Sequence, residues 1–163
     1  MKGWIFDASP LILLGKIHQL HLIEALSPAF RIPSSVVAEI GAGPTDDPSI
    51  AWLTSTLIAS HIVDAPPTPP FLSQWDLGAG ETAVLSLALA DEGSAVILDD
   101  LAARKFAMTF DIPLLGTLGL LIRAKHRGLI DLLAPQILHL ESAGANLSQS
   151  DIAHALNLAG EPA

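Results

Sequence analysis

Two apolar stretches that end in acidic residues decide how this chain folds: Trp4-Ile5-Phe6-Asp7 and Ala95-Val96-Ile97-Leu98-Asp99-Asp100. Short apolar runs between helix-like segments are typical of buried parallel strands. In an open α/β sheet, functional side chains gather beyond the carboxyl ends of the strands. The placement of Asp7, Asp99 and Asp100 therefore predicts a site built from carboxylates.

The rest of the chain alternates between strand-like and helix-like patterns. We expect strands at residues 3–7, 30–32, 61–63, 95–98 and 112–115. We expect helices at residues 11–26 (broken near 15), 33–40, 48–57, 77–92, 101–110, 117–127 and 132–140, and one after Ser148. This alternation predicts an α/β fold with a parallel sheet and right-handed crossovers. The proline-rich residues 65–70 predict an extended connection.

Several polar residues stand where these helices should begin, and side chains of this kind accept hydrogen bonds from the first backbone N–H groups of a helix. The candidate caps are Ser9, Asp76, Thr117 and Asp131, and Ser148 with Asp151 as a capping box. Asp76 could instead be an outer metal or water ligand.

Length and composition predict one domain. With 163 residues, half of them hydrophobic, the chain can bury a core of its own. We expect a single domain over residues 1–163, with the C-terminal helices from about residue 131 packing on or extending the core. The longest apolar run, residues 112–122, is shorter than the roughly 18 residues of a membrane span. With no secretory pattern after Met1 and no cysteine, we expect a cytoplasmic protein without disulfides or Cys-based metal sites.

The charges are few and unevenly distributed. A net charge of −9 argues against general, charge-driven binding of nucleic acid. Five of the eight Lys and Arg residues nevertheless fall between residues 104 and 127, namely Arg104, Lys105, Arg123, Lys125 and Arg127. We therefore expect the acidic and the basic residues to occupy different surfaces.

One carboxylate stands where an apolar side chain is expected. Glu81 shares a helical face with Val84, Leu85 and Ala88. Because removing an unpaired ion from water costs several kcal/mol, this face is expected to border a cleft. Glu39 poses a milder version of the same problem.

Each acid also has a purely structural interpretation. Asp7 could cap the first helix. Adjacent side chains leave a strand on opposite sides, so one member of the Asp99-Asp100 pair could cap the helix that begins at residue 101. Glu39 and Glu81 could lie at solvated helix edges. A doubly wound fold would nevertheless bring all of these positions close together. Clustered carboxylates need a cation, and oxygen ligands favour Mg²⁺ or Mn²⁺, which supply the chemistry of phosphodiester hydrolysis.

Five stretches in order along the chain resemble PIN domains, the metal-dependent ribonuclease fold of VapC-like toxins, and more closely a PIN-like branch of unknown function. They are Ile5-Phe6-Asp7-Ala8-Ser9-Pro10-Leu11, Ile32-Pro33-Ser34-Ser35-Val36-Val37-Ala38-Glu39, Asp76-Leu77-Gly78-Ala79-Gly80-Glu81, Ile97-Leu98-Asp99-Asp100-Leu101-Ala102-Ala103-Arg104 and Gly116-Thr117-Leu118-Gly119-Leu120-Leu121. The resemblance runs from the N-terminus to about residue 130.

The resemblance implies a PIN-like three-layer sandwich, a twisted parallel sheet with helices on both faces. It implies a metal-binding quartet of Asp7, Glu39, Glu81 and an aspartate of the Asp99-Asp100 pair. It also implies an Mg²⁺- or Mn²⁺-dependent endoribonuclease acting on RNA, the toxin of a type II toxin–antitoxin pair, often a dimer and inhibited by a small antitoxin. Many active PIN toxins have an aspartate as the third acid, where this chain has Glu81. The alternative is a PIN-fold module with weak or no catalysis that binds a protein or RNA partner.

Other residues are candidates for lesser roles. Arg104, Thr117 and Lys125 are candidate substrate contacts, although Thr117 could simply cap a helix and Lys125 could lie at a solvated helix end. Gly78 and Gly80 lower helix propensity in a first turn, so we expect the close approach of a backbone or a phosphate there.

Two other kinds of site have weaker support in the sequence. His18, His21 and Glu24 share a helical face that could bind zinc, a spacing common by chance. A phosphoacceptor of the receiver type would need an acidic pair after the first strand and a lysine after the last. Asp7 stands alone after the first strand and Gly116-Thr117 follows the last, so the sequence argues against that class.

Overall fold

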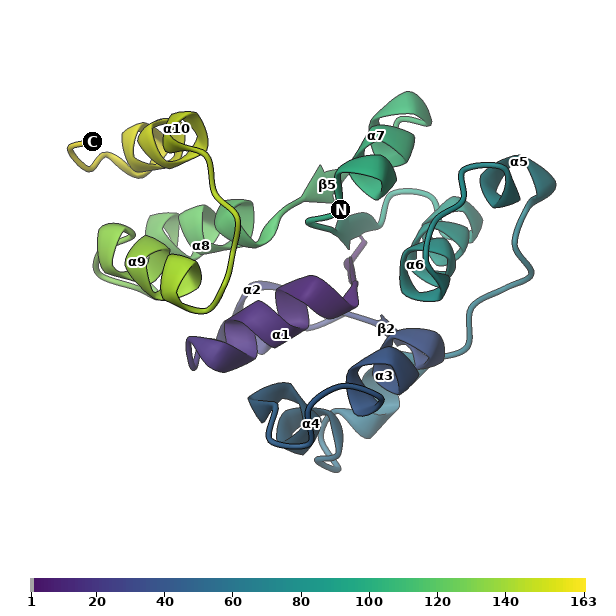
Figure 1. Cartoon of the computed structure of the whole chain (residues 1–163). Helices are drawn as coiled ribbons and strands as arrows, with labels where there is room; N and C mark the ends of the chain where they lie inside the picture. Colours follow the sequence, from purple (N-terminus) through teal and green to yellow (C-terminus); the bar gives the residue numbers. More distant parts are fainter. Residues whose placement is uncertain (1) are drawn as a thin grey trace.

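The computed structural model describes residues 2–163 and places short parallel strands at the centre of the molecule (Figure 1). The strands are β1 (Trp4–Phe6), β2 (Ile32–Pro33), β3 (Ile62–Val63), β4 (Ala95–Ile97) and β5 (Leu114–Leu115). One ladder has the order β1-β4-β5, and a second pairs β2 with β3. A parallel bridge between Ile5 and Arg31 joins the two ladders, which gives the strand order β3-β2-β1-β4-β5.

Helices cover both sides of these strands. They are α1 (Ala8–Lys16), α2 (His21–Leu26), α3 (Ser34–Gly41), α4 (Pro48–Leu53), α5 (Pro70–Ser73), α6 (Ala79–Ala90), α7 (Leu101–Thr109), α8 (Thr117–His126), α9 (Ala134–Ser142) and α10 (Gln149–Ala159), with a 3₁₀ turn at Ala59–His61. In Figure 1, α8 and α6 lie on opposite sides of the strands. Helix α1 packs on α4 and α8, whereas α6 packs on α7 and on both β1 and β4. The fold is the predicted three-layer α/β sandwich with a parallel sheet.

The two central strands are buried on both faces, which explains their uninterrupted apolar sequence. Ile5 and Phe6 of β1 and Val96 and Ile97 of β4 have no exposed surface. Phe6 is paired with Ile97, so the two strands end at the same edge of the sheet. The acidic residues that follow them are therefore neighbours. No helix in residues 2–163 is long and apolar enough to cross a membrane.

Two expected helix starts in the first half of the chain are wrong. Helix α1 begins at Ala8 directly after β1, with Asp7 as its N-cap residue, so Ser9 lies inside the helix. Helix α6 begins at Ala79 rather than at residue 77, and Gly78 is its N-cap residue. Asp76 has a φ of 52°, in the left-handed region, so it belongs to the turn before the helix and cannot cap it.

Of the caps predicted for the last two helices, one is confirmed and one is wrong. The capping box of α10 is confirmed, because the Ser148 hydroxyl accepts the Asp151 N–H at 3.0 Å. Asp131 does not cap α9. Glu161 does so from a position distant in sequence, accepting the N–H groups of Leu133 and Ala134 at 2.5 and 3.0 Å. These hydrogen bonds, the Leu133 bond above all, lower the pKa of Glu161.

Candidate functional site

The sheet brings two of the predicted acids to one edge. Asp7 follows β1 directly, and its N–H donates to the carbonyl of Ile97 at 3.1 Å. Asp99 follows the parallel strand β4 after one intervening residue. This is the arrangement that the two apolar stretches predict for adjacent parallel strands.

Asp7 is a buried carboxylate with an unsatisfied oxygen. The residue is 2% exposed, and Oδ1 has no hydrogen-bond partner. The pKa of Asp7 is raised from 3.8 to about 7, mainly by burial and also by the nearby charges of Glu81, Glu39 and Asp99, against the lowering effect of a hydrogen bond from the Ala8 backbone. An ionised Asp7 at this position calls for a cation, because the protein supplies no donor to Oδ1.

Glu39 and Glu81 approach Asp7 from two helices that pack against each other, α3 and α6. A Cβ atom added to Gly80 would lie under 3.0 Å from Oε2 of Glu39 and 3.1 Å from Oδ1 of Asp7. The pKa of Glu39 is raised, by partial burial of its carboxyl group and then by the charge of Glu81.

The glycines of this first helical turn therefore have a structural reason. A Cβ on Gly78 would likewise come under 3.0 Å from Oε2 of Glu81. The sequence predicts the close approach of a backbone or a phosphate at these glycines, whereas the structure places carboxylate oxygens there. Asp7, Glu39, Glu81 and Asp99 form what we call the acidic cluster.

The Asp99-Asp100 pair divides as the strand geometry predicts. Asp100 is the N-cap residue of α7, and its Oδ2 accepts the N–H of Ala103 at 2.8 Å. Asp99 turns instead toward Thr117, which donates its backbone N–H to Oδ1 at 2.8 Å and its hydroxyl to Oδ2 at 2.6 Å. Asp99 is therefore the member of the pair that joins the acidic cluster.

The interpretation of Thr117 as the cap of α8 is wrong. Gly116 is the N-cap residue, and Thr117 is 3% exposed and donates its hydroxyl to Asp99. Ser9, the second residue of α1, also donates to Asp99 Oδ2, at 3.4 Å. Both hydroxyl groups serve the acidic cluster rather than a helix end.

The three candidate substrate residues lie in different places. Arg104 and Thr117 line the groove that contains the acidic cluster. Arg104 donates to the carbonyl of Leu98 at 3.0 Å, and a Cβ atom added to Gly116 would lie 2.9 Å from Arg104 Nη1 and 3.0 Å from Asp99 Oδ1, so Arg104 lies close to Asp99. Lys125 is elsewhere, paired with Glu161 at 3.8 Å. The structure thus leaves Arg104 as the cation nearest to the acidic cluster among the three candidates.

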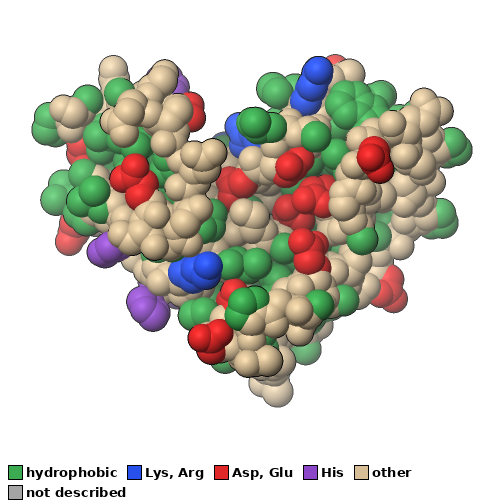
Figure 2. Space-filling view, viewed as in Figure 1, with side chains coloured by type: hydrophobic (Ala, Val, Ile, Leu, Met, Phe, Trp, Pro, Cys, Tyr) green, Lys and Arg blue, Asp and Glu red, His purple; other side chains and the backbone are tan. Residues whose placement is uncertain are grey.

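The acidic cluster opens into a groove of about 1000 Å³. Figure 2 shows acidic side chains gathered in the hollow between the side formed by α8–α10 and the side formed by α5–α7. Asp7, Glu81, Asp99 and its neighbour Asp100 line the groove, and much of its remaining wall is apolar. The apolar lining includes Leu13, Leu115, Leu118, Ile122, Leu140 and Leu147. The sequence does not identify this wall, because nothing in a helical pattern says which surface a C-terminal helix will cover.

The four carboxylates of the acidic cluster suit a hard divalent cation, although they do not already lie close enough together to bind one. All four side chains offer oxygen, the ligand type that Mg²⁺ and Mn²⁺ prefer, and Asp7 has a buried oxygen without a partner. Within residues 2–163, no three His, Asp or Glu side chains are already arranged to hold one metal ion, and that includes His18, His21 and Glu24. The acidic cluster would therefore have to contract around a cation.

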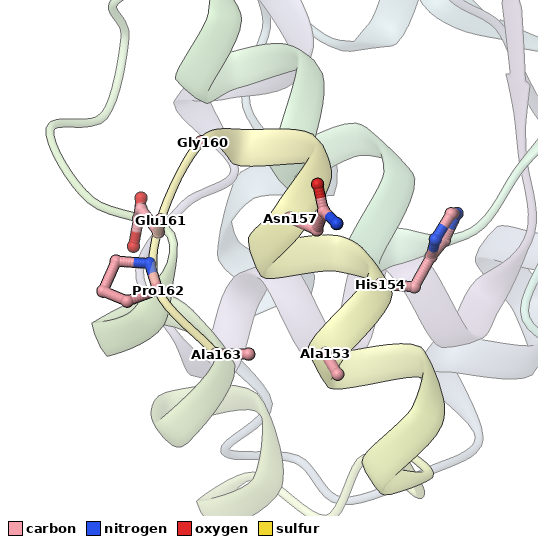
Figure 3. Close-up of a pocket in the computed structure, with 7 residues that line it drawn as sticks. All are labelled: Ala153, His154, Asn157, Gly160, Glu161, Pro162 and Ala163. Atoms are coloured by element: carbon pink, nitrogen blue, oxygen red, sulfur yellow. The ribbon is translucent and has the colours of Figure 1, made fainter.

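A second hollow, of about 630 Å³, lies at the C-terminal end (Figure 3). It is bordered by α10 and the last residues, and its labelled residues include His154, Asn157 and Glu161. The carboxylate of Glu161 is already used to cap α9. This hollow offers no cluster of chemical groups comparable to the groove.

Comparison with known proteins agrees with this architecture. The model of the family DUF3368, described as a PIN domain, matches residues 3–161. No curated protein and no solved structure matches the chain. PIN domains are generally nucleases and typically use divalent metals. With the match extending over nearly its whole length, the chain belongs to the PIN-domain family.

Proposed function

We propose that this protein is a metal-dependent endoribonuclease that hydrolyses RNA phosphodiesters. The observation that carries the proposal is the buried, unpartnered oxygen of Asp7, which has three further carboxylates nearby, two of them lining the same groove as Asp7. A groove of this kind can admit an extended strand. Family membership supports the same class of chemistry.

Asp7, Glu39, Glu81 and Asp99 would hold Mg²⁺ or Mn²⁺. When bound, such an ion polarises a phosphoryl oxygen and lowers the pKa of a water molecule. The hydrogen bonds from Thr117 fix the orientation of Asp99 in advance. Arg104 lines the groove beside Asp99 and can donate to a phosphate oxygen of the RNA. Asp7 must lose its proton before it can act as a ligand.

We further propose that the protein acts as the toxin of a type II toxin–antitoxin pair, in the cytoplasm and as a homodimer. The VapC-like pattern of the sequence supports this role. The apolar wall of the groove supports it too, because a segment of a small antitoxin could bury apolar side chains there while a basic side chain meets the acidic cluster. Copurification with the product of an adjacent short reading frame tests this part of the proposal.

One observation favours the alternative of a binding module with weak or no catalysis. Among residues 2–163, the carboxylates are near one another without already forming a three-ligand site. Such a module would bind its partner through the groove and would be indifferent to Mn²⁺. Metal affinity therefore discriminates between the two functions.

The decisive experiment combines binding of Mn²⁺ with cleavage of RNA. Wild type, Asp7→Asn and Glu81→Gln are compared with Asp100→Asn, whose altered residue caps α7 instead of serving the acidic cluster. We expect wild type and Asp100→Asn to bind Mn²⁺ and cleave, and the other two variants to lose both activities while remaining folded. Equal cleavage by all four proteins would indicate a contaminating nuclease, and no Mn²⁺ binding by wild type would favour the binding module.

A further inference from the structure

A basic pocket lies at the opposite end of β1 from the acidic cluster. Its volume is about 570 Å³, and it forms where β1 begins, whereas Asp7 stands where β1 ends. The lining residues are Lys2, Gly3, Trp4, Leu26, Ser27, Pro28, Ala29, Arg123, His126 and Arg127. It is thus built from the start of β1, the end of α2 and the end of α8.

The charge of this pocket is opposite to that of the chain. The sequence has 17 acidic residues and eight Lys and Arg, yet three of these eight line the pocket, and none of its lining residues is acidic. The acid nearest to Lys2 is Asp91, with Oδ1 3.4 Å from Nζ, and Asp91 is also held by Arg31 and Ser94.

Cations near the end of α8 also stabilise the helix dipole, and that effect alone could account for Arg123 and Arg127. It does not account for Lys2, which comes from another part of the chain and faces the same hollow. Neither Arg123 nor Arg127 forms an ion pair with any acid in the described part of the chain, residues 2–163. Their guanidinium donors are therefore available to an external anion.

The floor of the pocket is firmly held. The guanidinium carbon of Arg123 lies 6.0 Å from the centroid of the Trp4 ring, which is 4% exposed. A Cβ on Gly3 would come under 3.0 Å from the carbonyl oxygen of Ala29, so only glycine lets the two backbones meet. His126 Nε2 contacts the carbonyl oxygen of Leu158 at 2.7 Å. The basic side chains thus surround a preformed hollow.

We propose that the basic pocket binds a phosphate group, either of an RNA strand or of a free nucleotide, at a site separate from the acidic cluster. Two arginines and a lysine around one hollow suit an oxyanion, because planar guanidinium groups donate paired hydrogen bonds to phosphate oxygens. On RNA this contact would be independent of base sequence and would position the strand. The proposal does not depend on cleavage of RNA.

The test measures binding to metal-free protein in EDTA, so that no cleavage occurs. Inorganic phosphate, adenosine 5′-monophosphate and a short single-stranded RNA are titrated separately by calorimetry, with intrinsic tryptophan fluorescence, to which Trp4 contributes, as a second signal. The test variant is Arg123→Gln/Arg127→Gln, and the matched control is Lys16→Gln/Lys105→Gln, which removes two exposed charges outside the pocket. Circular dichroism checks that both variants remain folded.

We expect at least one of the three probes to bind wild type, and its affinity to fall about tenfold or more in the arginine variant and less than threefold in the lysine control. If RNA is the ligand, the slope of log affinity against log salt should also drop by about 0.7 for each phosphate that the substituted arginines no longer neutralise. Binding of phosphate or the nucleotide without RNA binding would identify a small-molecule site.

Three results would overturn the proposal: no binding of any probe, equal affinities in wild type and the arginine variant, or equally weakened binding in both double variants. Asp7→Asn separates this outcome from failure of the nuclease proposal. That variant should keep phosphate binding at the basic pocket whether or not the acidic cluster supports cleavage.

Discussion

Thr117 donates to both carboxylate oxygens of Asp99, through its backbone N–H to Oδ1 at 2.8 Å and through its hydroxyl to Oδ2 at 2.6 Å. The two residues are 18 positions apart and follow adjacent parallel strands, β4 and β5. A carboxylate gripped at both oxygens has little rotational freedom. Asp99 is thus held in one orientation by the fold itself, before any ligand binds.

Thr117→Val should weaken Mn²⁺ binding about tenfold, the lower end of the effect usual for a group that orients a metal ligand. Valine keeps the shape and the backbone N–H but removes the hydroxyl bond to Asp99. Thr117→Ser should restore most of the affinity. Calorimetric titration of Mn²⁺ measures both effects, and wild-type affinity in the valine variant would show that the hydroxyl has no such role.

Asp99→Asn and Asp100→Asn should behave differently despite being neighbours. Asp99→Asn removes a carboxylate of the acidic cluster, so Mn²⁺ affinity should fall at least about tenfold. Asparagine caps helices about as well as aspartate, so Asp100→Asn should leave both Mn²⁺ affinity and the free energy of unfolding nearly unchanged. A comparable loss of Mn²⁺ affinity in Asp100→Asn would assign that residue to the site as well.

Gly80→Ala should damage the metal site more than the fold. The added methyl would displace the Glu39 carboxylate and crowd Oδ1 of Asp7, lowering Mn²⁺ affinity about tenfold. Gly41→Ala is the matched control at another helical glycine, because its Cβ would meet no atom within 4 Å. That control should keep Mn²⁺ affinity and gain about 0.5–1 kcal/mol in the free energy of unfolding. Equal Mn²⁺ affinities in the two variants would contradict the close approach at Gly80.

Ionisation of the buried Asp7 carboxyl should lower the stability of the metal-free protein as the pH rises. The pKa of Asp7 is about 7 in the folded state and near 3.8 when unfolded, so between these values only the folded protein holds the proton. Stability therefore falls from about pH 4 to pH 7, by up to about 4 kcal/mol at 1.36 kcal/mol per pKa unit, and levels off above pH 7. Urea unfolding in EDTA across this range should show the fall in wild type and a flatter profile in Asp7→Asn.

Mn²⁺ should reverse that trend, because the ion competes with the proton on Asp7. The stabilisation gained from saturating Mn²⁺ should be greater at pH 8 than at pH 5. Identical profiles for wild type and Asp7→Asn, with and without Mn²⁺, would mean that Asp7 does not titrate in this range.

The central sheet and its acidic edge are predictable from local sequence, because burial on both faces requires continuous apolar strands and adjacent parallel strands end together. The same reasoning separates Asp99 from Asp100, since side chains alternate along a strand. The capping box of Ser148 is also a local pattern, with its partner three residues away.

Two of the wrong predictions, those for Thr117 and Asp131, concern partners that are distant in sequence. A hydroxyl at a helix start often caps that helix, but the partner of Thr117 is Asp99, which strand pairing brings to it. Asp131 stands at the expected start of α9, yet Glu161 reaches that helix from beyond α10. A local pattern shows that a group needs a partner, and only the packed chain decides which of several candidates is near.

The joint between the two strand ladders has a mechanical consequence. Glu39 lies on α3, which follows β2, whereas Asp7 follows β1. In residues 2–163, the backbone pairing between β1 and the β2 segment is limited to the one bridge between Ile5 and Arg31. A divalent ion shared by Glu39 and Asp7 would link the two ladders across this seam, the boundary between β1 and β2. Deuterium uptake at the seam amides, Phe6 N–H and Arg31 N–H, should then slow when Mn²⁺ is added. The ion would thus stabilise the part of the sheet that has the fewest paired residues between strands.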